Sequence, residues 1–267
     1  MERILHDDHS INRTVRQLTE IAIAHRFEGW LVNVEHAVAP TKVPALMTLV
    51  RRLRDAMWAV NDQALVVWYD SVTVQGQLKW QNALNNLNED WLLVSDAVYL
   101  NYGWTEHKEL AESGDRVDRL GRPRAHVMAG IDVFGRGCPG GWDCDVPLAA
   151  ARRHGLSVAI FAPGWLVETR PGEDPVLDSI RFWRPLLSNA SRRPIRELPL
   201  STDFSSGFSR RGRHFQLNRR VSGRGGRPGN APIILRAQLA PLFDVCGSIQ
   251  LNQTEPGVLL QPVDRIT

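Results

Sequence analysis

The chain has 267 residues, of which 43% are hydrophobic and 23% are charged, and its formal net charge is +3. This composition is that of a folded soluble protein with room for one large α/β domain, or a moderate domain with a smaller appendage. The three cysteines show no C-x-x-C spacing, which argues against a disulfide framework and a structural zinc site. The amino-terminal residues lack the apolar run of a signal peptide and no later stretch is long enough for a membrane span, so we expect a reduced, intracellular protein.

Short apolar runs alternate along the chain with segments of helical periodicity. The first helical pattern begins at Ser10, a possible N-cap. We expect helices at 10–27, 43–58, 78–92, within 105–124 and at 146–154, and strands at 29–35, 64–71, 97–102, 126–134 and 156–163. Five alternations at intervals of about 30 residues are the signature of repeated parallel βα units.

Each expected strand ends in polar or aromatic residues, whereas the glycine-rich motifs of nucleotide-binding sheets are missing. Such residues at the carboxyl ends of successive strands are typical of a TIM-type barrel. We therefore predict an α/β fold, a partial TIM-type (β/α) barrel of about five βα units, over residues 1–192. Five units do not close an eight-stranded barrel, so part of a closed barrel is missing. The character of the chain changes at about residue 193, and the part that follows includes a stretch rich in arginine and glycine.

Asn33 and Glu35 stand out at the end of the first expected strand. Because side chains alternate along a strand, residues two apart project to the same side. The pair could simply mark a strand that runs into a polar loop. It also fits a glycosidase in which the 2-acetamido oxygen of the sugar attacks the anomeric carbon. Such an enzyme needs one carboxylic acid for proton transfer and one polar group to orient the acetamido group.

Sugar rings lie on aromatic faces, and several aromatic residues near the expected strand ends could provide them. These candidates are Trp68, Tyr69, Trp80, Tyr102, Trp104 and Trp165. Trp58 and Trp91 fall on helical patterns, which favours positions in the hydrophobic core.

Five regions of the chain together closely resemble the cytosolic endo-β-N-acetylglucosaminidases of glycosyl hydrolase family 85. In order, they are LVNVE (31–35), VWYDS (67–71) with GQLKWQ (76–81), LNYGW (100–104), GIDVFGRG (130–137) and FAPGW (161–165). The resemblance is strong over residues 25–185. It continues weakly to about residue 244, where the family begins a β-rich accessory domain. In this family several strands precede the Asn-x-Glu pair, so the resemblance implies that the first three strands of the barrel are absent here, which would leave an unpaired strand edge. By the same match, residues 193–267 are expected to be the start of the accessory β-rich domain or an irregular basic tail.

The resemblance implies hydrolysis of the β-1,4 bond in the chitobiose core of N-linked glycans, with one GlcNAc left on asparagine. By this match Glu35 is the general acid/base and Asn33 orients the acetamido group. The predicted substrate-binding residues are Tyr69, Trp80, Tyr102, Trp104, Asp132 and Trp165. The resemblance implies a cytosolic protein that acts on glycoproteins or glycopeptides, with no metal or organic cofactor and no nucleic-acid or membrane partner.

Structural alternatives remain open for several of these residues. Tyr69, Trp80 and Trp104 could pack in the core or at its rim. Asp70 and Asp132 could cap a helix or pair with an arginine. The arginine-rich stretch 210–227 could contact nucleic acid, but Phe215 is the only aromatic residue within it, which favours a solvated loop. The whole chain could also be an inactive, truncated remnant that at most binds carbohydrate.

Overall fold

The computed structural model describes residues 1–25, 27–105, 107–163, 178 and 181–186, and the strands at 206–208, 214–216 and 258–261. The chain divides into two compact units. One comprises Met1–Ala190 with Ser248–Thr267, and the other is Ser191–Gly247.

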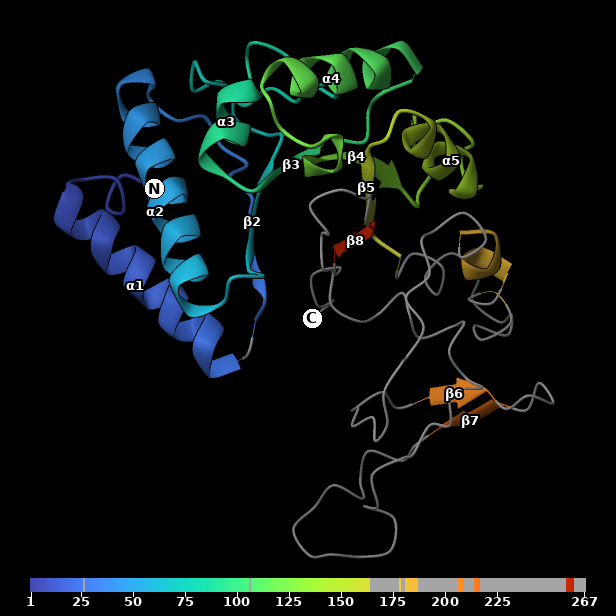
Figure 1. Ribbon diagram of the computed structural model, residues 1–267, viewed down its shortest axis with the longest axis horizontal. Helices are drawn as coiled ribbons and strands as arrows, with labels where there is room; N and C mark the ends of the chain where they lie inside the picture. The colour runs from blue at the N-terminus through green and yellow to red at the C-terminus, as the bar shows by residue number, and fades with distance from the viewer. Residues whose placement is uncertain are drawn as a thin grey trace, which may run out of the picture. The chain divides into compact units, whose positions relative to one another are not determined.

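The first unit is built on a six-stranded parallel sheet in the order β1-β2-β3-β4-β5-β8 (Figure 1). Its strands are β1 Gly29–Val32, β2 Leu65–Tyr69, β3 Ala97–Leu100, β4 Val127–Asp132, β5 Ser157–Phe161 and β8 Val258–Gln261. The predicted partial TIM-type α/β fold is confirmed over the first five strands. β8, which pairs in parallel with β5, was not predicted from the sequence.

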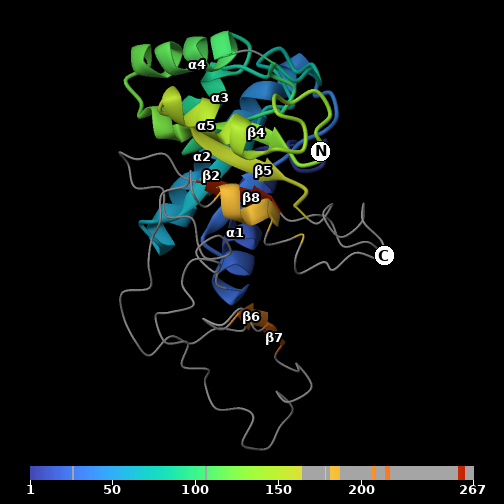
Figure 2. The ribbon, with the colours of Figure 1, turned by 90° about the vertical axis from the view of Figure 1, so that its right-hand side faces the viewer.

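The helices follow the strands in the order expected for βα units. They are α1 Asp8–His25, α2 Val43–Val60, α3 Glu89–Val94, α4 His107–Arg119 and α5 Asp145–Arg153, with 3-10 turns η1 Pro40–Lys42 and η2 Arg124–His126. α1 and α2 pack side by side, as Figures 1 and 2 both show. In the second unit, β6 Ser206–Phe208 pairs antiparallel with β7 His214–Gln216.

Alternate strand residues divide the core into two clusters on opposite faces of the sheet. On the outer face Trp68 and its neighbours pack with residues of the helices, among them Leu53 and Trp91. On the inner face Tyr69, Tyr99 and smaller residues form a separate cluster. This alternation follows from the two-residue period of a strand. It places every second residue of β1 to β5 on the inner face.

The indole rings of Trp68 and Trp91 stack with their centroids 3.8 Å apart, and both side chains are fully buried. Trp91 therefore lies in the core, as predicted. Trp58 does not. It is 47% exposed, it donates a hydrogen bond from its indole N–H to the Ala64 carbonyl, and the Arg54 guanidinium lies over its ring.

Replacing Trp91 with alanine is expected to lower the free energy of unfolding by about 4 kcal/mol, because it removes a buried indole and leaves a cavity beside Trp68. Trp58→Ala is a matched control on an exposed tryptophan, and we expect it to cost about 1 kcal/mol or less. Urea unfolding followed by circular dichroism measures both. Equal losses in the two variants would contradict the packing described for Trp91.

The predicted N-cap of the first helix is wrong by three residues. Asp7 caps α1, since its carboxylate accepts a hydrogen bond of 2.7 Å from the Ser10 backbone N–H. That N–H, more than the neighbouring His6, holds the pKa of Asp7 below its ordinary value. The favourable interaction of a carboxylate with a free helix N-terminus is the physical reason.

The helix predicted at 78–92 is largely wrong, because only its last part forms α3. The preceding loop takes its shape from Asp70, whose carboxylate accepts hydrogen bonds from the backbone N–H groups of Gln81 and Asn82. The Asn88 side-chain amide in turn donates to the Ala83 carbonyl. These tertiary partners replace the hydrogen bonds that a helix would have formed.

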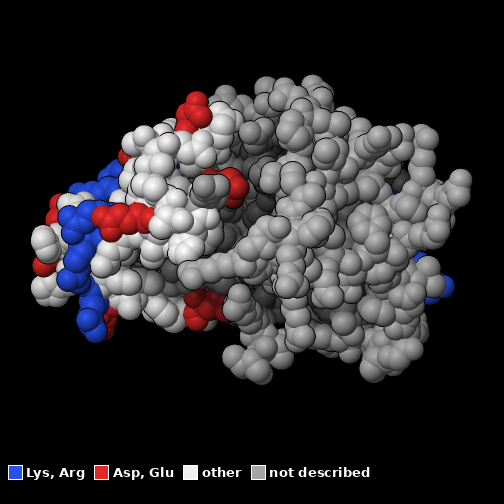
Figure 3. Space-filling model, turned by 90° about the horizontal axis from the view of Figure 1, so that it is seen from below, with Lys and Arg blue, Asp and Glu red and all other residues white. Residues whose placement is uncertain are grey.

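Two properties of the chain concern its possible binding partners: its helices and its surface charge. Among the described residues, no helix combines the length and the apolar character that a membrane span requires. On the face shown in Figure 3, the described lysine and arginine side chains (blue) lie beside aspartate and glutamate side chains (red). Both signs of charge are therefore present on this face.

Candidate active site

The carboxyl ends of the parallel strands bring the candidate residues to one edge of the sheet. β1 pairs with β2, β2 with β3, β3 with β4 and β4 with β5, all in parallel. Continuing the two-residue alternation of the inner face to the strand ends gives Asn33, Glu35, Tyr69, Asn101, Asp132 and Phe161. This edge is the candidate site.

Asn33 and Glu35 follow β1 directly and are both exposed. The Asn33 amide donates a hydrogen bond of 3.2 Å to Glu35 Oε1. Val34 between them is buried among the residues of the outer face. The two polar side chains therefore project to the same side, as the two-residue spacing predicts. Since the bond uses one N–H of the amide and one carboxylate oxygen, the pair also has further polar atoms that can meet a ligand.

Tyr69 and Tyr102 lie within electrostatic reach of Glu35. Burial, then the Tyr102 phenol and then the Glu35 carboxylate raise the pKa of Tyr69 above its ordinary value. Burial is also the main reason that the pKa of Tyr102 is raised, with a smaller effect from Glu35. Both phenols therefore stay protonated at neutral pH. They can donate or accept hydrogen bonds beside the Asn33–Glu35 pair.

Asp70 organises the loop after β2 from a buried position. One carboxylate oxygen accepts the N–H groups of Gln81 at 2.9 Å and Asn82 at 2.8 Å, and the other accepts the Asn88 amide at 2.9 Å. Burial raises the pKa of Asp70 to about 6, and these hydrogen bonds oppose the rise. The described contacts of Asp70 match neither predicted alternative, a helix cap or an arginine pair. Asp70 instead anchors the loop by accepting backbone and side-chain hydrogen bonds.

The loop anchored by Asp70 presents Trp80, which is 42% exposed. Tyr102, after β3, is half-buried and stacks on Phe161 with ring centroids 4.9 Å apart. Phe161 also stacks with Phe134 at 6.1 Å. These aromatic side chains come from β5 and from loops that follow β2, β3 and β4, so several elements contribute to the edge.

Two of the predicted substrate-binding residues are fully buried. Trp104 packs in the core, and its indole N–H donates a hydrogen bond of 2.7 Å to the Gly130 carbonyl. Asp132 pairs with Arg136 at 3.1 Å and accepts the Phe134 backbone N–H. These positions correspond to the core-packing and arginine-pairing alternatives. Trp165 lies outside the described residues.

Several residues at this edge were not selected from the sequence. Asn101, Phe134, Phe161 and Arg136 contact the predicted residues through the hydrogen bonds, ion pair and ring contacts at this edge. Strand parity could have identified Asn101 and Phe161, because each continues the inner-face alternation of its strand. Asn82 gave no such signal, since its place depends on a loop conformation with φ of 61°.

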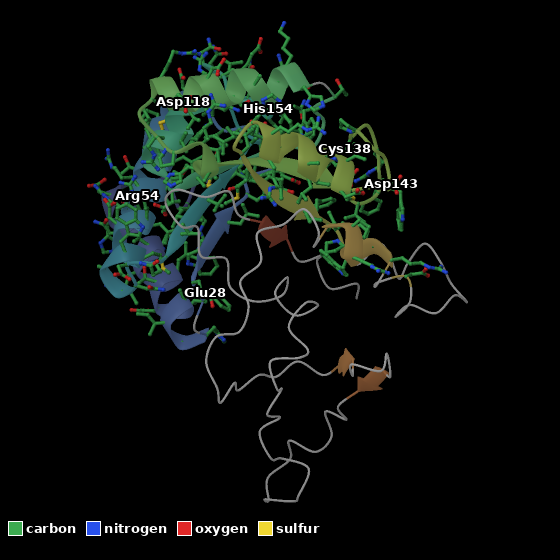
Figure 4. All side chains as sticks on the ribbon, turned by 45° about the vertical axis from the view of Figure 1, so that its right-hand side comes forward. Glu28, Arg54, Asp118, Cys138, Asp143 and His154 are labelled. Carbon is green, nitrogen blue, oxygen red and sulfur yellow. The ribbon has the colours of Figure 1, made fainter. Side chains whose placement is uncertain are left out.

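The loop between β4 and α5 carries two buried thiols, Cys138 and Cys144, and Figure 4 labels Cys138 together with Asp143 of the same loop. Burial raises the pKa of Cys138 to about 11 and that of Cys144 to about 12, so both are protonated at neutral pH. Within the described ranges, no group of three or more histidine, cysteine, aspartate or glutamate side chains is placed to hold a metal ion.

Sequence comparison identifies relatives over most of the chain. The model of glycosyl hydrolase family 85 matches residues 1–212. A cytosolic endo-beta-N-acetylglucosaminidase from Gallus gallus is 39% identical over 195 residues, which are 72% of this chain and 26% of that protein. The protein of the same name from Homo sapiens is 36% identical over 210 residues, or 77% of this chain and 27% of that protein. The chain thus spans about a quarter of the length of these relatives.

Structural comparison agrees at the level of the fold. The crystal structure of the Endo-D glycoside hydrolase domain from Streptococcus pneumoniae R6 superimposes with a TM-score of 0.52 at 17% sequence identity. The match covers 69% of this chain and 31% of that one. Since the family model covers well over half of a chain that also shares this fold, the chain belongs to glycosyl hydrolase family 85.

Proposed function

We propose that this chain carries the catalytic pair of an endo-β-N-acetylglucosaminidase. The reaction is hydrolysis of the β-1,4 bond in the N,N'-diacetylchitobiose core of N-linked glycans, which leaves one GlcNAc on the protein. The observation that carries the proposal is the Asn33–Glu35 hydrogen bond of 3.2 Å at the carboxyl edge of a parallel sheet. The family assignment and the names of the relatives support the same class of reaction.

In the proposed mechanism the substrate supplies the nucleophile. The acetamido oxygen attacks the anomeric carbon while Glu35 gives its proton to the departing glycosidic oxygen. Asn33 holds the acetamido group in position for this attack. Glu35, now a carboxylate, then takes a proton from water as the water oxygen attacks the same carbon and opens the oxazolinium ring. Two inversions at one carbon give net retention of configuration.

The proposed sugar contacts are the aromatic residues with accessible surface at this edge. Trp80 and Tyr102 are partly exposed, whereas Tyr69 is nearly buried, with 4% of its surface exposed. Trp104 and Asp132 act in our proposal from below the surface, where they hold the Gly130 carbonyl and Arg136. Trp165 stays a proposed contact on the strength of the family resemblance.

A second candidate function is carbohydrate binding without catalysis. It is favoured by one observation: among the described strands, β1 pairs with β2 alone, and the Asn33–Glu35 pair is exposed. A catalytic acid of this kind works best when the site excludes water. Binding of glycopeptide with no release of glycan, in the wild type and in Glu35→Gln alike, would favour this second function.

We propose N-linked glycans of glycoproteins or glycopeptides as the partners, and the cytosol as the location. The location rests on the names of the relatives from Gallus gallus and Homo sapiens, which are cytosolic enzymes by name. We propose no cofactor and no nucleic-acid or membrane partner. The arginine-rich stretch 210–227 lies outside the described residues except for β7.

Asn33→Ala tests the proposed division of labour. We expect it to slow release of glycan from a high-mannose glycopeptide by about 10² to 10³, because the acetamido group loses its orienting partner while Glu35 is unchanged. A preformed sugar oxazoline already contains the bond that the first step forms. Its turnover should therefore fall by about tenfold or less. Equal losses with both substrates would contradict the role of Asn33.

A further inference from the structure

Tyr69 is joined to the loop after β2 by a short chain of hydrogen bonds. The Tyr69 hydroxyl donates to Asn101 Oδ1 at 2.7 Å, and Asn101 Nδ2 donates to Asn82 Oδ1 at 2.6 Å. The backbone N–H of Gly103 donates to the same Asn82 oxygen at 3.0 Å. The loop after β2 and the segment after β3 thus meet at one carboxamide oxygen.

The hydrogen bond from the Gly103 N–H determines which group is the donor in every other hydrogen bond of this series. A backbone N–H can only donate, so the Asn82 atom facing Gly103 must be the oxygen. The Asn101 atom that faces this oxygen must then be the nitrogen, which places the Asn101 oxygen against Tyr69. Tyr69 therefore has to donate its proton to Asn101. The Tyr102 phenol lies near Tyr69 as well and raises its pKa, after burial as the main cause.

The position of Asn82, the last residue of this hydrogen-bond chain, is fixed by backbone contacts that do not involve Tyr69. Asn82 adopts a left-handed conformation with φ of 61°, and its backbone N–H is bound by Asp70 at 2.8 Å. Gly103 has no Cβ, and one built there would lie 2.7 Å from Asn82 Oδ1. The glycine therefore allows the close approach of its own N–H. The backbone contacts of Asn82 and Gly103 therefore determine that Tyr69 donates to Asn101 and that Asn101 donates to Asn82.

We propose that Asn82 and Asn101 are positioning residues that commit the Tyr69 proton to the scaffold, so that the phenol oxygen offers a lone pair to the bound sugar. The contact with sugar rests on the proposed function. Tyr69 then recognises a hydrogen-bond donor on the substrate, an amide N–H or a hydroxyl, and not a carbonyl oxygen. This acceptor is in place before the substrate arrives, which avoids reorganisation during the reaction.

The first test needs no activity. The chain has three tyrosines, so ¹³Cζ-tyrosine labelling gives three resonances that Tyr→Phe variants assign. We expect Asn101→Ala and Asn82→Gly to shift the Tyr69 resonance, because both disrupt the chain that orients its hydroxyl; glycine tolerates the positive φ of residue 82. Asn101→Asp keeps an acceptor and should leave Tyr69 a donor. Tyr99, whose buried hydroxyl has no hydrogen-bond partner in the described structure, is the internal reference.

Asn12→Ala serves as the matched control, since Asn12 is exposed on α1 and pairs with Arg52. It should move none of the three resonances. A Tyr69 resonance that is the same in wild type, Asn101→Ala and Asn82→Gly would overturn the proposed chain. A folded control and folded variants, checked by circular dichroism, make the comparison valid.

The second test asks whether these hydrogen bonds contribute to the rate of the proposed reaction. We expect Tyr69→Phe and Asn101→Ala each to lower kcat on a high-mannose glycopeptide by about tenfold, and the double variant to lose no more than either alone. KM should change little. A double variant whose loss is the product of the single losses would overturn the positioning role. An inactive wild type would contradict the proposed function, while the tyrosine resonances would still support or overturn the hydrogen-bond chain.

Discussion

Replacing Glu35 with glutamine is expected to lower the rate of glycan release by about 10² to 10⁴. Glutamine has nearly the same shape and can still accept a hydrogen bond from Asn33 through its side-chain oxygen. It cannot give a proton to the departing oxygen or take one from water. The loss should therefore appear in kcat, with KM nearly unchanged.

The measurement is release of a labelled high-mannose glycan from a glycopeptide under saturating conditions. Glu28→Gln is the matched control, because Glu28 is an exposed glutamate at the opposite, amino-terminal end of β1, as Figure 4 shows. We expect its rate to equal that of the wild type. If Glu35→Gln also released glycan at the wild-type rate, Glu35 would not be the acid.

Asp70→Ala should also have a large effect, a loss of about 3 kcal/mol in the free energy of unfolding. The substitution leaves the N–H groups of Gln81 and Asn82 and the buried amide of Asn88 without their acceptor. The loop that carries Trp80 should loosen with them. Urea unfolding measures the stability. The fluorescence of Trp80, obtained by subtracting the spectrum of a Trp80→Phe variant, reports on the conformation of the loop. An unfolding curve that matches the wild type would contradict the anchoring role.

Asp70→Asn makes a separate prediction about pH. Burial raises the pKa of Asp70 to about 6, so in the folded state the carboxyl resists ionisation that the unfolded chain undergoes at about 4. Wild-type stability from this group is therefore largest below pH 4 and falls as pH rises to 6. The asparagine variant lacks this dependence. Its stability relative to wild type should rise between pH 4 and pH 6, and parallel pH profiles would contradict the shift.

The sequence was sufficient to predict the βα repeat because the strands are apolar on both faces. β2, for instance, runs from Leu65 to Tyr69 without a polar residue, and its two neighbours in the sheet are similar. The pattern at 78–92 failed as a helix because Asp70, 11 and 12 residues earlier, binds the backbone N–H groups of Gln81 and Asn82. Periodicity carries no information about such a partner. β8 is no shorter than β1 and β3, but it lies outside the regular strand–helix alternation that identified those two strands.

The candidate site was predictable where strand parity alone decides it. Asn33 and Glu35 project together because they are two residues apart on the continuation of β1. Parity does not report depth, however, and so it could not show that Trp104 and Asp132 are fully buried while Trp80 is exposed. Those differences arise from tertiary packing and from the Arg136 ion pair.

The central claim is that the Asn33–Glu35 pair serves endoglycosidase chemistry, and the mass of the peptide product tests it most directly. A high-mannose glycopeptide incubated with the chain should yield a peptide that keeps one GlcNAc on its asparagine, and Glu35→Gln should yield almost none. A peptide that keeps its whole glycan after long incubation, or one that loses both core GlcNAc residues, would contradict the proposed reaction.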